Sequence, residues 1–164
     1  MKLPQNECRW LWIASLLLAL LLGLPFLLAF VQQGGDWHFS GFLIAVEDGN
    51  SYIAKMLRGA NGEWLFRSPY STVEQSGTLI YLPYLLLGKL LGPTASHAAF
   101  LAAFHLSRIV SIFMLSFASY RFISLFIKGI SWRRFAWLLS HLGGGLGWLL
   151  LVMGQENWLG SLPL

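Results

Sequence analysis

An apolar run from Trp10 to Val31 constrains this chain more than any other feature of its sequence, because Ser15 is its only polar side chain. At a rise of about 1.5 Å per residue, a helix over this run reaches ~33 Å, which is enough to cross a hydrocarbon core of ~30 Å. The run is also longer than the ~7–15 apolar residues of a cleavable signal peptide. We therefore expect an uncleaved transmembrane helix over residues 10–31, kinked at Pro25.

The composition agrees with a membrane protein, since 56% of the residues are hydrophobic and only 11% are charged. A soluble domain carries about 25% charged residues. The net charge of +4 is therefore read by the positions of the basic residues relative to a membrane, and it does not indicate a nucleic-acid partner. The sequence predicts an all-α integral membrane protein whose partners include membrane lipids.

Two later segments are long enough to span a bilayer, residues 98–127 and residues 135–153. Between them and the first run lies "TLIYLPYLLLGKLLG", residues 78–92. As a helix this segment reaches only ~22 Å, which is too short to cross unaided. We expect three transmembrane helices, with residues 78–92 forming an interfacial helix that does not cross.

Basic residues set the expected orientation, because cytoplasmic loops are enriched in Lys and Arg. Lys2 and Arg9 precede the first run, and Lys128, Arg133 and Arg134 fall between the last two. We therefore expect residues 1–9 to be a cytoplasmic N-terminus and residues 128–134 a cytoplasmic loop. Residues 32–97 are then an extracytoplasmic loop, and residues 154–164 are the start of a further one.

The chain ends at "ENWLGSLPL" without a closing charge cluster. We therefore expect a fragment of a longer protein, whose remaining transmembrane helices would be partners of this part. A bacterial plasma membrane is the predicted location.

The stretch "VEDGNSYIAKMLRGANGEWLF" concentrates charge just after the first span. Within it, Asn50 to Arg58 has the spacing of a short amphipathic helix that lies at the membrane surface, with apolar side chains on one face. Asp48 or Asn50 is expected to cap its start, and Gly59 to end it. The apolar face is expected to hold Tyr52, Ile53, Met56 and Leu57.

Several short motifs occur in a characteristic order. Asp48 and Tyr52 form a D-x-x-x-Y pattern, Gly62 to Trp64 form a turn, residues 78–92 form the interfacial segment, and Arg108 follows in the second span. This set resembles the C-type glycosyltransferase superfamily, in particular the protein mannosyltransferases and the lipid A aminoarabinose transferases. The sequence departs from that pattern in two places. Relatives often have an acid where this chain has Gly49, and a K-P-P where it has "QSG", residues 75–77.

The resemblance implies a hexosyltransferase that uses a polyprenyl-phosphate-linked sugar as donor. Asp48 is then the expected general base, with Glu47 tuning it or helping to bind a divalent metal. Lys55, Arg58 and Arg108 are expected to gather the donor phosphate through charge-assisted hydrogen bonds. A partly desolvated carboxylate suits the role of base. No cofactor is indicated beyond the option of a divalent metal.

Structural roles for the same residues remain open at this point. Glu47 and Asp48 also fit a helix cap and a solvated acid, and Lys55 and Arg58 fit contacts with lipid headgroups. Arg108 also fits a structural pair with an acid of the loop, and His105 a structural hydrogen bond. Scattered histidines give no metal-ligand spacing. For the whole chain, the alternatives are a non-catalytic polytopic membrane subunit and a transporter fragment.

Overall fold

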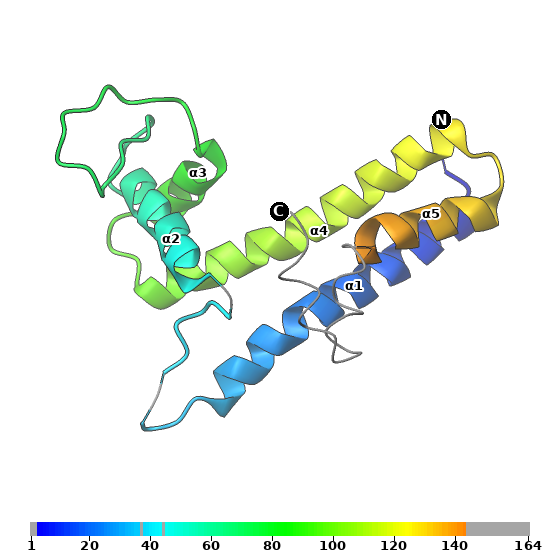
Figure 1. The fold of residues 1–164 in the computed structure, drawn as a ribbon, viewed down its shortest axis with the longest axis horizontal. Helices are drawn as coiled ribbons and strands as arrows, with labels where there is room; N and C mark the ends of the chain where they lie inside the picture. The colour runs from blue at the N-terminus through cyan, green and yellow to red at the C-terminus, as the bar shows by residue number, and fades with distance from the viewer. Residues whose placement is uncertain (1–2, 37, 44, 144–164) are drawn as a thin grey trace, which may run out of the picture. The chain divides into compact units, whose positions relative to one another are not determined.

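The computed structural model describes residues 3–36, 38–43 and 45–143. Over these residues the chain is all-helical, and a single isolated antiparallel bridge joins Phe66 to Thr78. Figure 1 shows the helices in chain order, with these bounds: α1 Gln5–Gln32, α2 Val46–Ala60, α3 Leu82–Leu91, α4 His97–Phe126 and α5 Ile130–Leu142.

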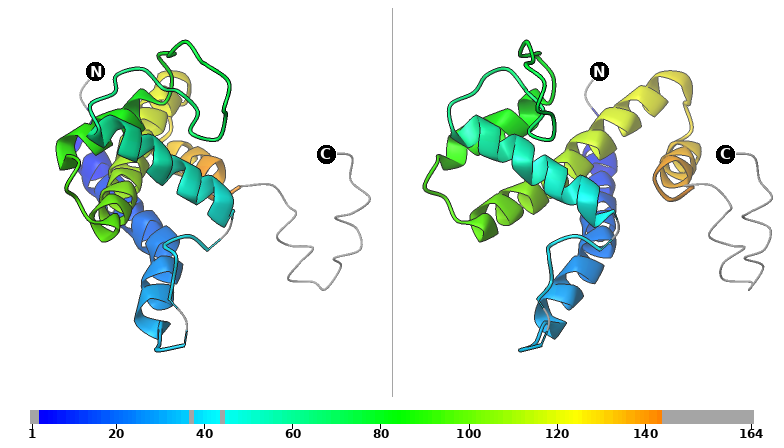
Figure 2. Two further views of the ribbon diagram at one scale, coloured as in Figure 1. Left: turned by 90° about the vertical axis from the view of Figure 1, so that its left-hand side faces the viewer. Right: turned by 60° about the vertical axis from the view of Figure 1, so that its left-hand side comes forward.

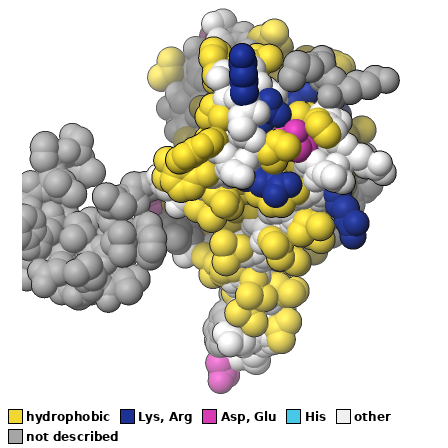
Figure 3. Space-filling model, turned by 90° about the vertical axis from the view of Figure 1, so that its right-hand side faces the viewer, with side chains coloured by type: hydrophobic (Ala, Val, Ile, Leu, Met, Phe, Trp, Pro, Cys, Tyr) yellow, Lys and Arg dark blue, Asp and Glu magenta, His cyan; other side chains and the backbone are white. Residues whose placement is uncertain are grey.

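Two of the described helices, α1 and α4, are long and apolar enough to cross a membrane. They correspond to the first two predicted spans. Helix α1 begins five residues earlier than expected, because the polar residues before Trp10 also form helix. Their outward side chains are largely apolar, including Leu17 and Leu21 on α1 and Met114 on α4. Hydrophobic side chains gather over the face drawn in Figure 3. The short helix α3 has 10 residues, and it is not among the helices that could cross.

The third predicted span is not among the membrane-spanning candidates of the described residues. Helix α5 begins at Ile130, earlier than the expected residue 135, and ends at Leu142. The rest of that predicted span, and residues 154–164, lie outside the described residues. The expected loop at 128–134 is also shorter than predicted, because Arg133 and Arg134 belong to α5.

The chain divides into two compact units. Among the described residues, the first combines those up to Ser15 with those from Phe113 onward, and the second runs from Leu16 to Ile112. Each long helix therefore contributes one part to each unit, and the units are described separately.

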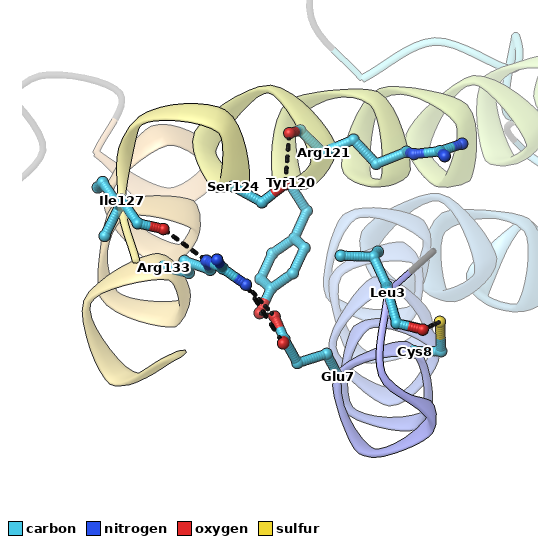
Figure 4. A network of polar contacts seen from close by, with 8 residues as sticks. All are labelled: Leu3, Glu7, Cys8, Tyr120, Arg121, Ser124, Ile127 and Arg133. Atoms are coloured by element: carbon cyan, nitrogen blue, oxygen red, sulfur yellow. Dashed lines mark hydrogen bonds and ion pairs between the residues drawn. The ribbon is translucent and has the colours of Figure 1, made fainter. Parts of the chain in front are cut away.

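The first unit encloses a buried polar network (Figure 4). Glu7, 2% exposed, accepts hydrogen bonds from the Tyr120 hydroxyl at 2.7 Å and from Arg133 Nη1 at 3.1 Å. Arg133 Nε also donates to the carbonyl of Ile127 at 2.6 Å. Because a buried charge is costly unless it is paired and hydrogen-bonded, these contacts account for the burial of Glu7 and Arg133. Beside the network, Trp137 packs edge-on against Trp10, with ring centroids 5.5 Å apart.

The second unit is organised around the pair of helices α2 and α3, which lie side by side (Figure 2). A Cβ atom added to Gly59 would overlap the backbone of Leu85, and one added to Gly88 would overlap the carbonyl of Met56. The two glycines therefore permit a backbone approach that any larger residue would prevent. Around this pair, the core consists of Phe42, Ile53, Met56, Ala60, Phe100 and Leu101.

The predicted bounds and caps of the amphipathic helix were wrong. Helix α2 starts after Ala45, which has φ 50° and makes no side-chain capping bond, so Asp48 and Asn50 lie inside the helix. At its other end the helix continues past Gly59 to Ala60. The physical reason is packing: Gly49 contacts Phe42 and Gly59 contacts α3, so tertiary contacts rather than local capping signals set the length.

The faces of α2 also differ from the prediction. Ile53 and Met56 are buried as expected, whereas Leu57 is 44% exposed and Lys55 is only 8% exposed. Lys55 is buried because it lies beside Tyr52 and Tyr81, whose rings accept its ammonium group.

Candidate functional site

Asp48 and Arg108 line one cavity of about 280 Å³ within the second unit. The two residues come from different helices, α2 and α4, and are far apart in sequence. The other lining residues are mostly aromatic or small: Phe26, Phe42, Ala45, Gly49, Tyr52 and Phe104. The cavity thus combines an acid and a guanidinium with an apolar wall.

Asp48 reaches the cavity from the first turn of α2. An acid is favourable at this position, because the unpaired N–H groups at a helix start carry partial positive charge. The residue is exposed rather than partly desolvated as the sequence suggested. Its neighbour Glu47 is exposed as well, and within the described residues no hydrogen bond or ion pair involves it.

Arg108 is held by uncharged groups. Its Nη2 donates to the carbonyl of Leu22 at 3.2 Å, and its guanidinium carbon lies 3.9 Å from the ring centroid of Phe26. Its Nε is buried without a partner. The described part of the chain shows no ion pair to Arg108, so the structural pairing with a loop acid is not seen. The positive charge therefore remains available to an anionic group in the cavity.

Aromatic contacts fix the wall of the cavity. Tyr52 stacks on Phe104 with centroids 5.8 Å apart, and Phe42 meets Phe104 edge-on at 5.4 Å. His105 Nε2 lies 3.0 Å from the carbonyl of Gly41, which is a structural hydrogen bond of the kind expected. This bond ties the segment before α2 to α4, and so places Phe42 against the core.

Lys55 lies next to this cavity but does not line it. Its Nζ donates to Ser51 Oγ at 2.9 Å and lies 4.5 Å from the ring centroid of Tyr52 and 4.2 Å from that of Tyr81. Burial lowers the pKa of Lys55, and the negative charge of Asp48 opposes that shift. The ammonium group is engaged by protein groups rather than directed to a ligand in this cavity.

Arg58 is placed elsewhere. It forms an ion pair with Glu63, with 3.0 Å between Nη1 and Oε1, and it lines a second cavity near the loop after α2. The expected phosphate-binding group of Lys55, Arg58 and Arg108 is therefore not brought together in one place. Of its three members, only Arg108 shares a cavity with Asp48.

The sequence did not single out Phe26, Phe42 or Phe104 as site residues, because aromatic residues in apolar segments look alike before the helices pack. A pattern that pairs an arginine of one long apolar helix with a phenylalanine of another would have been the available signal. For metals, the described residues contain no group of three or more His, Cys, Asp or Glu side chains that could hold an ion.

Comparison with known proteins adds no relative to this picture: no family model matches the chain, and no curated protein or solved structure is similar to it.

Proposed function

We propose that this chain forms part of a membrane glycosyltransferase resembling the C-type superfamily. The reaction transfers a sugar from a polyprenyl-phosphate donor to a hydroxyl acceptor on the extracytoplasmic face. The observation that carries the proposal is the shared cavity of Asp48 and Arg108, since it brings a proton acceptor and a cation for a phosphate to one place.

The chemistry assigns one role to each residue. Asp48 accepts the proton of the acceptor hydroxyl. At the same time the oxygen of that hydroxyl bonds to the anomeric carbon of the sugar. The bond from that carbon to the phosphate oxygen breaks, and the electron pair leaves with the polyprenyl phosphate. Arg108 stabilises the developing charge on this phosphate through its guanidinium N–H groups. Glu47 precedes Asp48 on α2 but does not line the cavity, so we assign it no step in this reaction.

The aromatic wall supports this assignment. Tyr52 and Phe104 add apolar surface to the cavity lining, against which the apolar face of a sugar can pack. Arg108 is held in place by Leu22 and Phe26 before any ligand binds, so little reorganisation is needed when charge develops. Lys55 adds positive charge next to the cavity without entering it.

The expected topology has support from the Glu7–Arg133 ion pair. If α1 and α4 both cross the membrane, this contact puts the start of α1 and the segment after α4 on the same side. Helices α2 and α3, which lie between them in sequence, are then on the other side together with Asp48. We propose a third span over residues 135–153, of which α5 contains the first part, and a cytoplasmic N-terminus in a bacterial plasma membrane.

Arg108→Gln tests the donor half of this proposal in membranes that contain the protein, with a radiolabelled polyprenyl-phosphate sugar as donor. Loss of one charge-stabilising donor typically lowers kcat by about 10²–10³-fold. Arg108→Lys should recover part of the loss because the charge returns. Lys128→Gln removes the same charge from an exposed position of the other unit and serves as the matched control. Equal transfer by Arg108→Gln and wild type would exclude Arg108 from donor binding.

A further inference from the structure

Residues 66–78, within the connection between α2 and α3, form a closed loop. Phe66 and Thr78 join its ends through two backbone hydrogen bonds, of 2.8 Å and 3.0 Å. Inside it, Arg67 Nε donates to the carbonyl of Gln75 at 3.3 Å, and the Ser68 N–H donates to Gln75 Oε1 at 3.0 Å. Compact loops with joined ends are often functional.

The loop encloses part of a polar cavity of about 360 Å³. Arg58 contributes from the last turn of α2, where Glu63 holds it, and the remaining lining residues belong to the loop. They are Arg67, Ser68, Ser71, Val73, Glu74 and Gln75. None of them lines the cavity of Asp48, so the two cavities are separate.

Hydrogen-bond donors outnumber acceptors in this cavity. The oxygens of Ser68 and Ser71 accept backbone N–H groups of the loop, at 3.4 Å and 3.3 Å, so both hydroxyl protons remain free to donate. Arg67 uses only Nε in the contacts of the described residues, which leaves its terminal nitrogens for a ligand. The Gln75 side-chain oxygen is already engaged, and Glu74 is the lining residue that can only accept.

The charges of the cavity limit the ligand further. Glu63 offsets the charge of Arg58, so Arg67 and Glu74 set the local balance. A donor-rich cavity with an arginine favours an oxyanion, because guanidinium groups bind carboxylate and phosphate oxygens in pairs. The carboxylate of Glu74 opposes a second negative charge. We propose that the loop cavity binds a singly charged oxyanion, a phosphodiester or a carboxylate, with Arg67 as its main anchor.

The test measures hydrogen exchange of the loop peptide, residues 66–78, in the purified full chain. Dimethyl phosphate and acetate are the soluble probes, and nanodiscs with or without phosphatidylglycerol provide a lipid phosphodiester. We expect slower exchange in the loop when a probe binds. A response to the soluble probes indicates a soluble ligand, and a response only to phosphatidylglycerol indicates a lipid headgroup. Absence of any response in the wild type, in both arms, would overturn the proposal.

Three variants should differ in the ligand concentration that protects the loop from exchange. Arg67→Gln should need about tenfold more ligand for the same protection, because it removes a hydrogen bond to a charged group. Glu74→Gln should need less ligand than the wild type, since it removes the opposing charge. Lys128→Gln changes the net charge outside the loop and should respond like the wild type. An Arg67→Gln response equal to that of the wild type would also overturn the proposal. Because the two cavities share no residue, this result is independent of glycosyl transfer.

Discussion

Arg133 donates two hydrogen bonds from Nη1 to the carboxylate of Glu7, at 3.1 Å and 3.3 Å, in the buried part of the first unit. The contact joins the first turn of α1 to the first turn of α5, and Tyr120 of α4 completes it from a third helix. A network that touches three helices fixes their mutual packing more specifically than apolar contacts alone.

Arg133→Gln should therefore destabilise the protein strongly, because it leaves the buried Glu7 carboxylate without its cation. Breaking a buried pair in this way typically costs about 3–5 kcal/mol. Arg134→Gln is the matched control. The Arg134 guanidinium lies 5.1 Å from the ring centroid of Trp10, and a cation–π contact of this kind is worth about 0.5–1 kcal/mol. Denaturant unfolding in detergent measures both, and equal losses for the two variants would contradict the buried pair.

Gly88→Ala should loosen the pairing of α2 with α3. The added methyl group would meet the Met56 carbonyl, and overpacking of this kind costs about 1–3 kcal/mol. Gly23→Ala is the control, because a Cβ atom there meets nothing within 4 Å. A change in thermal unfolding for Gly88→Ala alone is the expected result. If both glycines tolerate alanine equally, the close approach of the two helices is not required.

Cysteine labelling with an impermeant reagent tests the topology, in a background where Cys8 is replaced by Ser. Cysteines placed at Ser76 and Thr94, both exposed, should react from outside intact cells. A cysteine at Ser131 should react only after permeabilisation. Protection of position 94 in intact cells would show that the segment around α3 crosses the membrane, and would require a different arrangement of the spans.

Lys55 gives the stability a defined pH dependence. In the folded protein, burial lowers the pKa of Lys55 below its usual value of 10.5, and the negative charge of Asp48 opposes this shift. Between the lowered folded value and 10.5, the unfolded chain binds more protons at this position, so stability rises with pH across that window. Relative to Lys55→Met, the wild type should gain stability as the pH rises toward 10.5. Burial raises the pKa of Tyr84, but this contribution is present in both proteins and cancels. A difference in unfolding midpoint that stays flat or falls with pH would contradict this account.

The helices were largely predictable from sequence, because length and hydropathy decide whether a segment such as residues 10–31 or 98–127 forms a long apolar helix. The details of α2 were not, because its start depends on Phe42 packing against Gly49 and its length on the contact between Gly59 and α3. Periodicity alone placed Leu57 on the packed face, whereas Lys55 is the buried residue.

The candidate site was predictable only in part. The order of motifs selected Asp48 and Arg108, and both line the same cavity. The sequence also grouped Arg58 with them, but in the structure Arg58 pairs with Glu63 and lines the other cavity. Charge in a sequence shows that cations are nearby, but the helix geometry decides which cavity each one faces. The partners of Glu7 could not be found at all without the packed helices.

In the proposed reaction Asp48 takes the proton of the acceptor hydroxyl, and Asp48→Asn removes this base. The amide keeps the shape of the side chain but cannot serve as a base, and general-base catalysis is worth about 10²–10⁴-fold. Asp36→Asn makes the same change at an exposed position outside the cavity and is the control. Transfer is measured with a polyprenyl-phosphate sugar that the wild type uses, at matched protein levels in the membrane. We expect Asp48→Asn to lose activity by that factor while Asp36→Asn retains it. Wild-type transfer by Asp48→Asn would contradict the account and leave Asp48 as a surface residue of α2.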